Sequence, residues 1–145
     1  MSFDQNHNDE IRRRFKTKAK SMSSHMSNTK WRKLFKTVAP VLRATAPWGS
    51  DVQTKCRYKL LGEDLERSGK WPEEKDLLEI YISDGVWGCP VEYQHIEWVM
   101  ILLTYEINPN AKAVHNIKEV AEVLKGVAEF PIEETGNSLK ILGYK

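Results

Sequence analysis

Two hydrophobic periods that follow one another along the chain constrain its fold more than any other feature. Apolar residues first recur at helical spacing, from Trp31 through Leu34 and Phe35 to Val38. From Val52 to Leu60 every second residue is then Gln, Lys or Arg, the alternation of a half-buried strand. This change of period predicts helices packed against a sheet that has one buried face.

The first helix has clear boundaries in the sequence. Asn28 or Thr29 can cap its start. Because Pro40 has no N–H to donate, we expect the helix to end near Ala39 or to kink there. Residues 47–51, which contain Pro, Gly and Asp, read as a loop.

The middle of the chain predicts two further strands. Residues 77–82 read as the first, closed by a turn at Asp84 and Gly85. The apolar positions of residues 91–107 also fit a helix, but Ile, Val, Trp, Tyr and Thr dominate them and favour a strand. We therefore predict a strand over about residues 96–105.

The end of the chain predicts a helix and a hairpin. Asn116, with Glu119 three residues later, resembles a capping box ahead of a helical apolar pattern. A turn centred on Gly136 and Asn137 would place Ile132 opposite Ile141 and Glu133 opposite Lys140. Because Pro131 cannot donate to a ladder, its strand should lie at an edge or begin there.

These elements define an α+β domain over residues 26–145, with a small, mainly antiparallel sheet of four to five strands and two principal helices packed on one face. The predicted core residues are Trp31, Leu34, Phe35, Val38, Cys56, Tyr58, Leu60, Ile80, Trp98, Val120, Leu124 and Ile141.

Charge is distributed unevenly along the 145 residues. Residues 1–25 carry +3, residues 26–70 carry +6 and residues 71–145 carry −7, which together give the net charge of +2. Residues 1–25 have too few apolar side chains to offset ordering, so we expect a disordered basic leader. The leader lacks the apolar segment of a secretory signal, and the longest apolar run is six residues, so we expect a cytoplasmic protein that does not contact membranes.

Catalytic and metal chemistry find little support. The two cysteines and the two histidines of the domain, Cys56, Cys89, His95 and His115, contain no pair at the short spacing of structural zinc sites. Two free thiols are expected in a cytoplasmic chain. No nucleotide-binding glycine motif is present. We expect no cofactor and no enzyme activity; an enzyme, tested through His95 or Cys89, ranks third among the functional hypotheses.

The tryptophans offer a candidate interface. Trp48, Trp71 and Trp87 lie in predicted loops beside Gly or Pro. Capping of the core accounts for them most simply, yet exposed aromatics among acidic residues are also typical of protein interfaces. The candidate interface comprises Asp84, Trp87, Glu92 and Glu97.

Nucleic-acid binding is the alternative. It would use the leader together with the basic faces of the first helix and of the strand that ends at Leu60, provided that the two faces are coplanar. The candidate contacts are Arg12, Arg13, Arg14, Lys30, Lys33 and Lys36. The acidic C-terminal half argues against a phosphate-binding track.

Three short motifs carry a resemblance to a known family. They are the Asn-Thr-Lys-Trp box that begins at Asn28, the Ile-Glu-Trp motif that ends at Trp98, and the closing Gly143-Tyr144. Over about residues 26–145 the chain resembles a family of small, uncharacterised bacterial proteins, a domain of unknown function. The resemblance implies that Met26 is the natural start, and it brings no catalytic residues with it.

Small bacterial proteins of this kind often look like immunity proteins, which bind a cognate toxin in the cytoplasm. An acidic half would complement the basic surface of a nuclease toxin and would speed its capture. We therefore expect a non-enzymatic protein-binding module with a toxin-like protein partner.

Overall fold

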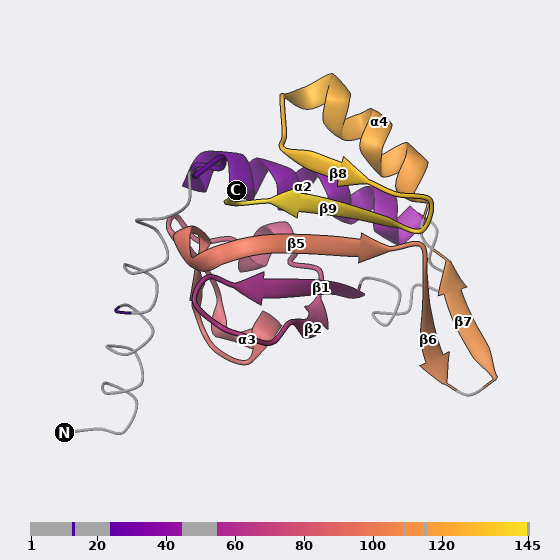
Figure 1. The fold of residues 1–145 in the computed structure, drawn as a ribbon, viewed down its shortest axis with the longest axis horizontal. Helices are drawn as coiled ribbons and strands as arrows, with labels where there is room; N and C mark the ends of the chain where they lie inside the picture. Colours follow the sequence, from indigo (N-terminus) through magenta and orange to yellow (C-terminus); the bar gives the residue numbers. More distant parts are fainter. Residues whose placement is uncertain (1–12, 14–23, 45–54, 109, 115, 145) are drawn as a thin grey trace.

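A five-stranded antiparallel sheet carries two long helices on one of its faces (Figure 1). The computed structural model describes residues 13, 24–44, 55–108, 110–114 and 116–144. The strand order in the sheet is β2-β1-β5-β9-β8, and β3–β4 and β6–β7 form two separate two-stranded sheets. In chain order the elements are α2 (Asn28–Ala44), β1 (Lys55–Leu60), β2 (Arg67–Lys70), β3 (Tyr81–Ile82), α3 (Asp84–Trp87), β4 (Val91–Glu92), β5 (Ile96–Leu102), β6 (Thr104–Asn108), β7 (Ala111–Val114), α4 (Ile117–Val127), β8 (Ile132–Glu134) and β9 (Ser138–Leu142), with short 3-10 helices at Glu74–Asp76 and Tyr93–His95.

Helix α2 confirms the predicted apolar face but not the predicted end. Trp31, Leu34, Phe35 and Val38 are all buried, as their spacing predicts. The helix nevertheless continues past Pro40 to Ala44. Pro40 is exposed, and the complete burial of Leu42 one half-turn later offsets the backbone hydrogen bond that the proline cannot make.

The C-terminal helix and hairpin form as predicted. The Asn116 side chain accepts a hydrogen bond from the Glu119 N–H at 3.1 Å and caps α4. In the β8–β9 hairpin Ile132 pairs with Ile141 and Glu133 pairs with Lys140, which is the predicted register. Strand β8 forms one edge of the sheet, as Pro131 requires. Short-range sequence patterns therefore predict the structure of residues 116–144 correctly.

The region from residue 77 to residue 82 departs from the predicted strand. Only Tyr81 and Ile82 form a strand, because the Leu78 N–H donates to the Tyr81 carbonyl and closes a tight turn. Ile80 lies in that turn and is 49% exposed, so its predicted place in the core is wrong. The expected turn at Asp84 and Gly85 is the short helix α3.

Strand β5 lies within the predicted range, but Trp98 faces the other way. Val99 and Ile101 are fully buried under the helices, so Trp98, which alternates with them, lies on the opposite face of the sheet and is only partly buried. Its predicted place in the core is therefore wrong. Strand β6 then leaves the sheet and pairs with β7, in a hairpin that the sequence analysis does not predict.

Residues 24 and 25, which precede α2, lie beside residues 143 and 144, which follow β9. Ser24 bridges Tyr144, and the His25 N–H donates to the Gly143 carbonyl at 2.9 Å. Ser24 and His25 fall within the predicted disordered leader, but their backbone pairing places them in the folded part. The rest of the predicted leader, apart from Arg13, lies outside the described residues, as do Trp48 and residues 52–54 of the predicted strand. In the part of the chain that is described, no helix is long and apolar enough to cross a membrane.

Candidate interaction surface

Trp87 belongs to the core and not to an exposed interface. Its ring stacks on Tyr58 with 3.8 Å between centroids and 8° between planes, and it meets the edge of Phe35. Its indole N–H donates to the Lys70 carbonyl at 2.8 Å, and only 7% of the residue is exposed. An added Cβ at Gly69 would lie 2.6 Å from the indole, so β2 needs a glycine there. The prediction that the loop tryptophans cap the core is confirmed for Trp87 and for Trp71.

The three acidic members of the candidate interface lie on three different elements. Asp84 begins α3 and is exposed. Glu92 lies in β4, where its carboxylate accepts from Gln94 and lies 3.8 Å from His95. The Glu97 carboxylate, in β5, binds the Lys59 ammonium at 2.7 Å. Trp87 is buried, and Glu92 and Glu97 already have partners within the chain. Asp84 is therefore the member of the candidate interface that remains exposed.

Of the predicted nucleic-acid contacts, some already have partners within the chain and others are exposed. The basic side of α2 packs beside the acidic segment 73–92: Lys36 pairs with Glu74 at 3.1 Å, and Arg32 donates to the Glu79 carbonyl. Lys30 donates to the Glu129 carbonyl, Lys33 is exposed, and so is Arg13, whereas Arg12 and Arg14 lie outside the described residues.

The basic faces of α2 and β1 are not coplanar. Tyr58 of β1 points into the core under α2, so its neighbours Arg57 and Lys59 point to the other side of the sheet. A single phosphate-binding track across both elements, as the nucleic-acid hypothesis requires, is therefore absent.

Cysteine and histidine chemistry finds no site in the described residues. Cys56 is buried, and burial raises the pKa of its thiol far above the usual range, which suppresses the reactive thiolate. Cys89 is exposed. Among the described residues no group of three or more His, Cys, Asp or Glu side chains is arranged to hold a metal ion. His115 lies outside them.

A pocket of about 410 Å³ opens where the β6–β7 hairpin, the start of α4 and the β8–β9 turn meet. The Asn116 side chain caps the helix at this point, so it occupies the position that an anion would take. Val114 on the rim is 57% exposed. The pocket is lined by Leu103, Val114, Asn116, Ile117, Lys118, Glu134, Thr135 and Gly136.

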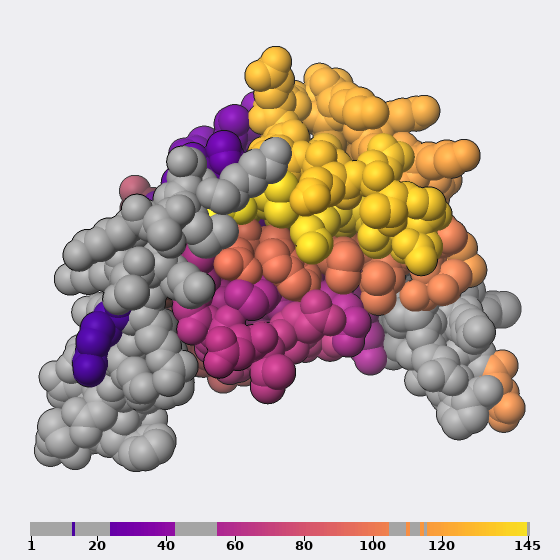
Figure 2. Space-filling model, in the orientation of Figure 1, coloured from indigo at the N-terminus to yellow at the C-terminus, as the bar shows by residue number. Residues whose placement is uncertain are grey.

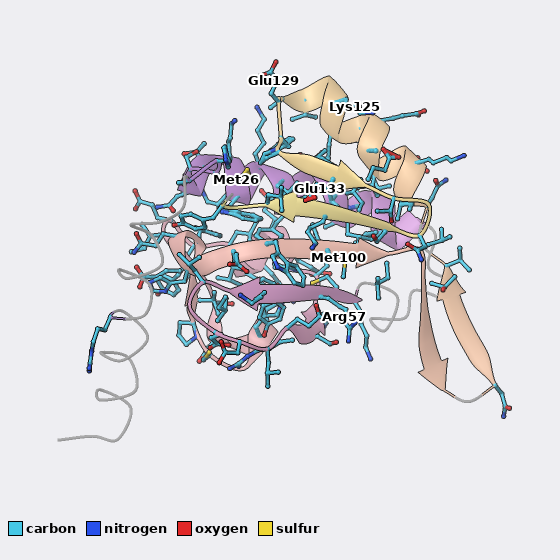
Figure 3. All side chains as sticks on the ribbon, in the orientation of Figure 1. Met26, Arg57, Met100, Lys125, Glu129 and Glu133 are labelled. Atoms are coloured by element: carbon cyan, nitrogen blue, oxygen red, sulfur yellow. The ribbon has the colours of Figure 1, made fainter. Side chains whose placement is uncertain are left out.

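A second acidic surface, which the sequence reading did not single out, follows α4 and β8. Five exposed carboxylates lie on these two elements and on the segment between them, against the two exposed ammonium groups of Lys118 and Lys125. Figure 3 shows Glu129 projecting from the end of α4, away from the sheet. We call Glu119, Glu122, Glu129, Glu133 and Glu134 the acidic surface. Glu133 lies at its margin, because it alternates with Ile132 and Glu134 on β8 and points to the side of the sheet opposite α4.

Among the residues that the structure describes, no helix covers the face of the sheet opposite α2 and α4. Figure 2 looks onto this face and shows atoms of β9, β5 and β1 at the surface in yellow, orange and magenta. An apolar stripe on β5 lies between basic side chains on β1 and on β9. We call Arg57, Lys59, Trp98, Met100, Leu102, Glu133, Lys140 and Leu142 the open sheet face.

The cationic side chains of the open sheet face already have partners within the chain. The Lys140 ammonium lies 4.6 Å from the centre of the Trp98 ring, a cation–π contact. Arg57 pairs with Glu66 at 3.0 Å. The predicted hairpin register correctly pairs Glu133 with Lys140. The prediction for Trp98, however, places this residue in the core, on the other side of the sheet. The sequence reading therefore did not recognise this surface.

Together these features define a small α+β domain whose five-stranded antiparallel sheet carries two helices on one face. The chain belongs to a family of unknown function, DUF6678, which it matches over residues 14–145. The match confirms the expected membership of a family of unknown function and begins twelve residues before the predicted start at Met26. No curated protein and no solved structure matches the chain.

Tyr93, which directly follows Glu92 of the candidate interface in the chain, is buried, and its ionisation tests the packing of this region. Burial raises the pKa of Tyr93 to about 12, although the Arg32 guanidinium opposes the shift. Its hydroxyl donates to the Leu78 carbonyl at 2.8 Å, so the folded state favours the neutral phenol. The resulting stabilisation is complete below pH 10, the usual pKa, and is lost as the pH rises from 10 to 12.

Replacing Tyr93 with Phe should therefore remove the most alkaline step from an absorbance titration of the tyrosines. It should also flatten the loss of stability between pH 10 and 12. Tyr81→Phe, in which a partly exposed tyrosine is replaced, serves as the control. The assignment of the shift to Tyr93 would be wrong if the alkaline step persisted in Tyr93→Phe.

Proposed function

We propose that this chain is a non-enzymatic protein-binding module that presents its acidic surface to a basic protein partner. The observation that carries the proposal is the exposure of all five carboxylates of the acidic surface on α4, on β8 and between them. Exposed charge of one sign steers an oppositely charged partner and raises its association rate. The acidic segment 73–92, by contrast, contacts the basic side of α2 within the same chain.

In its most concrete form the module is an immunity-type protein that neutralises a toxin. A nuclease toxin needs a basic surface to bind phosphates, and that surface is what an acidic protein complements. The proposal moves the contact surface from Asp84, Trp87, Glu92 and Glu97 to α4 and β8, because Trp87 is buried and Glu97 is paired.

Two charge-matched variants test the proposal. The first reverses Glu122, Glu129 and Glu134 to Lys on the acidic surface; the second reverses the equally exposed Asp64, Glu79 and Asp84. Each full-length variant is used to capture partners from a lysate of the native organism after nuclease treatment. We expect one protein to bind the wild type and the second variant but to lose most of its affinity for the first.

The same experiment separates the alternatives. Loss of binding by the second variant alone would return the contact surface to the segment around Asp84. Equal binding by all three chains would remove the acidic surface from the proposal. Material that is recovered only before nuclease treatment would favour nucleic-acid binding. Toxicity of the captured protein, relieved by co-expression of this chain, would establish the immunity role.

A further inference from the structure

One row of side chains across the open sheet face is complementary to itself. Cα pairing places Arg57 beside Met100, Met100 beside Lys140, and Lys140 beside Glu133, on β1, β5, β9 and β8. Figure 3 shows Arg57, Met100 and Glu133 one above the other across the strands. The row begins with a cation and ends with an anion. A second copy turned end for end would therefore oppose unlike charges at both ends.

Only one orientation of a two-fold axis in the plane of the sheet gives this match. An axis that runs along the strands between β5 and β9 places Arg57 of each copy over Glu133 of the other. It also places Met100 over the aliphatic stem of Lys140. An axis across the strands would place the basic side chains of β1 against their own copies, which is repulsive.

The neighbouring row supplies apolar contacts in the same arrangement. Trp98 pairs with Leu142 in register, so the axis between β5 and β9 places Trp98 of one copy over Leu142 of the other. Trp98 is the partly exposed member of this pair, and Leu142 is only 7% exposed. Side chains of facing sheets interdigitate in this way when the sheets pack about 10 Å apart. A single orientation therefore satisfies both the charged and the apolar rows.

The charged groups of the row retain capacity for a second contact. The Arg57 side chain is 44% exposed, and its ion pair with Glu66 uses only part of the five donors of the guanidinium. Glu133 is exposed at the edge of the sheet. Both side chains can therefore add a contact to a second copy without breaking the contact that Arg57 already makes.

We propose that the open sheet face binds a second copy of this chain and forms a two-fold symmetric dimer in which Arg57 of each copy contacts Glu133 of the other. This inference goes beyond the proposed function, because the dimer uses the sheet face and leaves most of the acidic surface free. Four strands at about 4.8 Å spacing form a face of a few hundred Å² on each copy. That area lies at the small end of specific interfaces, so the dimer is weak and dissociates on dilution.

Sedimentation of the full chain, from about 1 μM to about 1 mM, tests the dimer through a charge swap. Arg57→Glu and Glu133→Arg should each raise the dissociation constant about tenfold or more, since each opposes like charges at two symmetric contacts. The double variant should recover most of the lost affinity. An equimolar mixture of the two single variants should form heterodimers, in which both contacts are again between unlike charges.

Three further variants and a folding check complete the test. Lys125→Glu and Glu122→Arg make the same charge changes on α4 and should leave the dissociation constant unchanged. Met100→Lys opposes Lys140 without touching the Arg57–Glu66 ion pair, so it keeps the test valid if Arg57→Glu does not fold, as judged by circular dichroism.

A wild-type chain that stays monomeric up to about 1 mM would overturn the dimer proposal, because even a weak specific interface associates in that range. So would a double variant that is no better than the worse single variant. Neither result affects partner capture by the acidic surface.

Discussion

Replacing Trp71 with alanine should lower the free energy of unfolding by about 3–5 kcal/mol, the usual cost of removing a large aromatic side chain from a packed core. Trp71 is 1% exposed and meets the edge of Phe35 with 5.1 Å between ring centroids. Its indole N–H donates to the Phe35 carbonyl at 3.0 Å. The indole therefore fixes the start of the segment after β2 to the middle of α2, and its loss leaves a cavity and removes this hydrogen bond.

Trp98→Ala is the matched control, because it removes the same side chain from the open sheet face. Trp98 is partly exposed, and its cation–π contact with Lys140 contributes about 0.5–1 kcal/mol. We therefore expect Trp98→Ala to cost about 2 kcal/mol or less. Urea unfolding followed by far-ultraviolet circular dichroism measures both. Equal losses would show that the helix-covered face is not the main core.

Replacing Gly143 with alanine should cost about 1–3 kcal/mol, because the chain has no space for a methyl group at this position. An added Cβ would collide with the Ile96 carbonyl and would lie 3.0 Å from Cζ2 of the buried Trp31. The backbone cannot easily move away: the Gly143 N–H donates to the Glu97 carbonyl at 2.7 Å, and its carbonyl accepts from His25.

Gly126→Ala is the opposite case and serves as the control. A Cβ at Gly126 meets nothing within 4 Å, and the residue lies in α4. Alanine there should stabilise the protein by about 0.5–1 kcal/mol through helix propensity. Thermal unfolding of the two variants should thus shift in opposite directions. A neutral Gly143→Ala would mean that β9 can move away from β5 at low cost.

Sequence reasoning was most successful where neighbouring residues decide the structure. The capping pair Asn116 and Glu119 predicts the start of α4, and Gly136 with Asn137 predicts the register of the β8–β9 hairpin. In both cases the interacting residues lie within a few positions of one another. Steric and hydrogen-bonding preferences of short segments are sufficient there.

The errors arise where contacts between distant parts of the chain determine which side chains are buried and where an element ends. In the run from Trp98 to Leu103 every residue is apolar, so alternation cannot tell which set faces the helices; Val99 and Ile101 do, and Trp98 does not. For Trp87 the sequence favours capping of the core but leaves an exposed interface open, and the stacking on Tyr58, from a distant strand, decides between them. Pro40 predicts the end of a helix that the burial of Leu42 prolongs. The acidic surface likewise depends on elements that the fold brings together.

Strand β9 lies between β5 and β8, although it follows both of them, and β1 and β2, along the chain. Until residue 142 has emerged from the ribosome, β5 exposes an unpaired edge next to unburied Val99 and Ile101. Such an edge can pair with other chains, and nascent chains with exposed apolar strands aggregate. The sheet is therefore completed only after β9 has been synthesised, and translation products that stop before β9 are natural clients of chaperones and proteases.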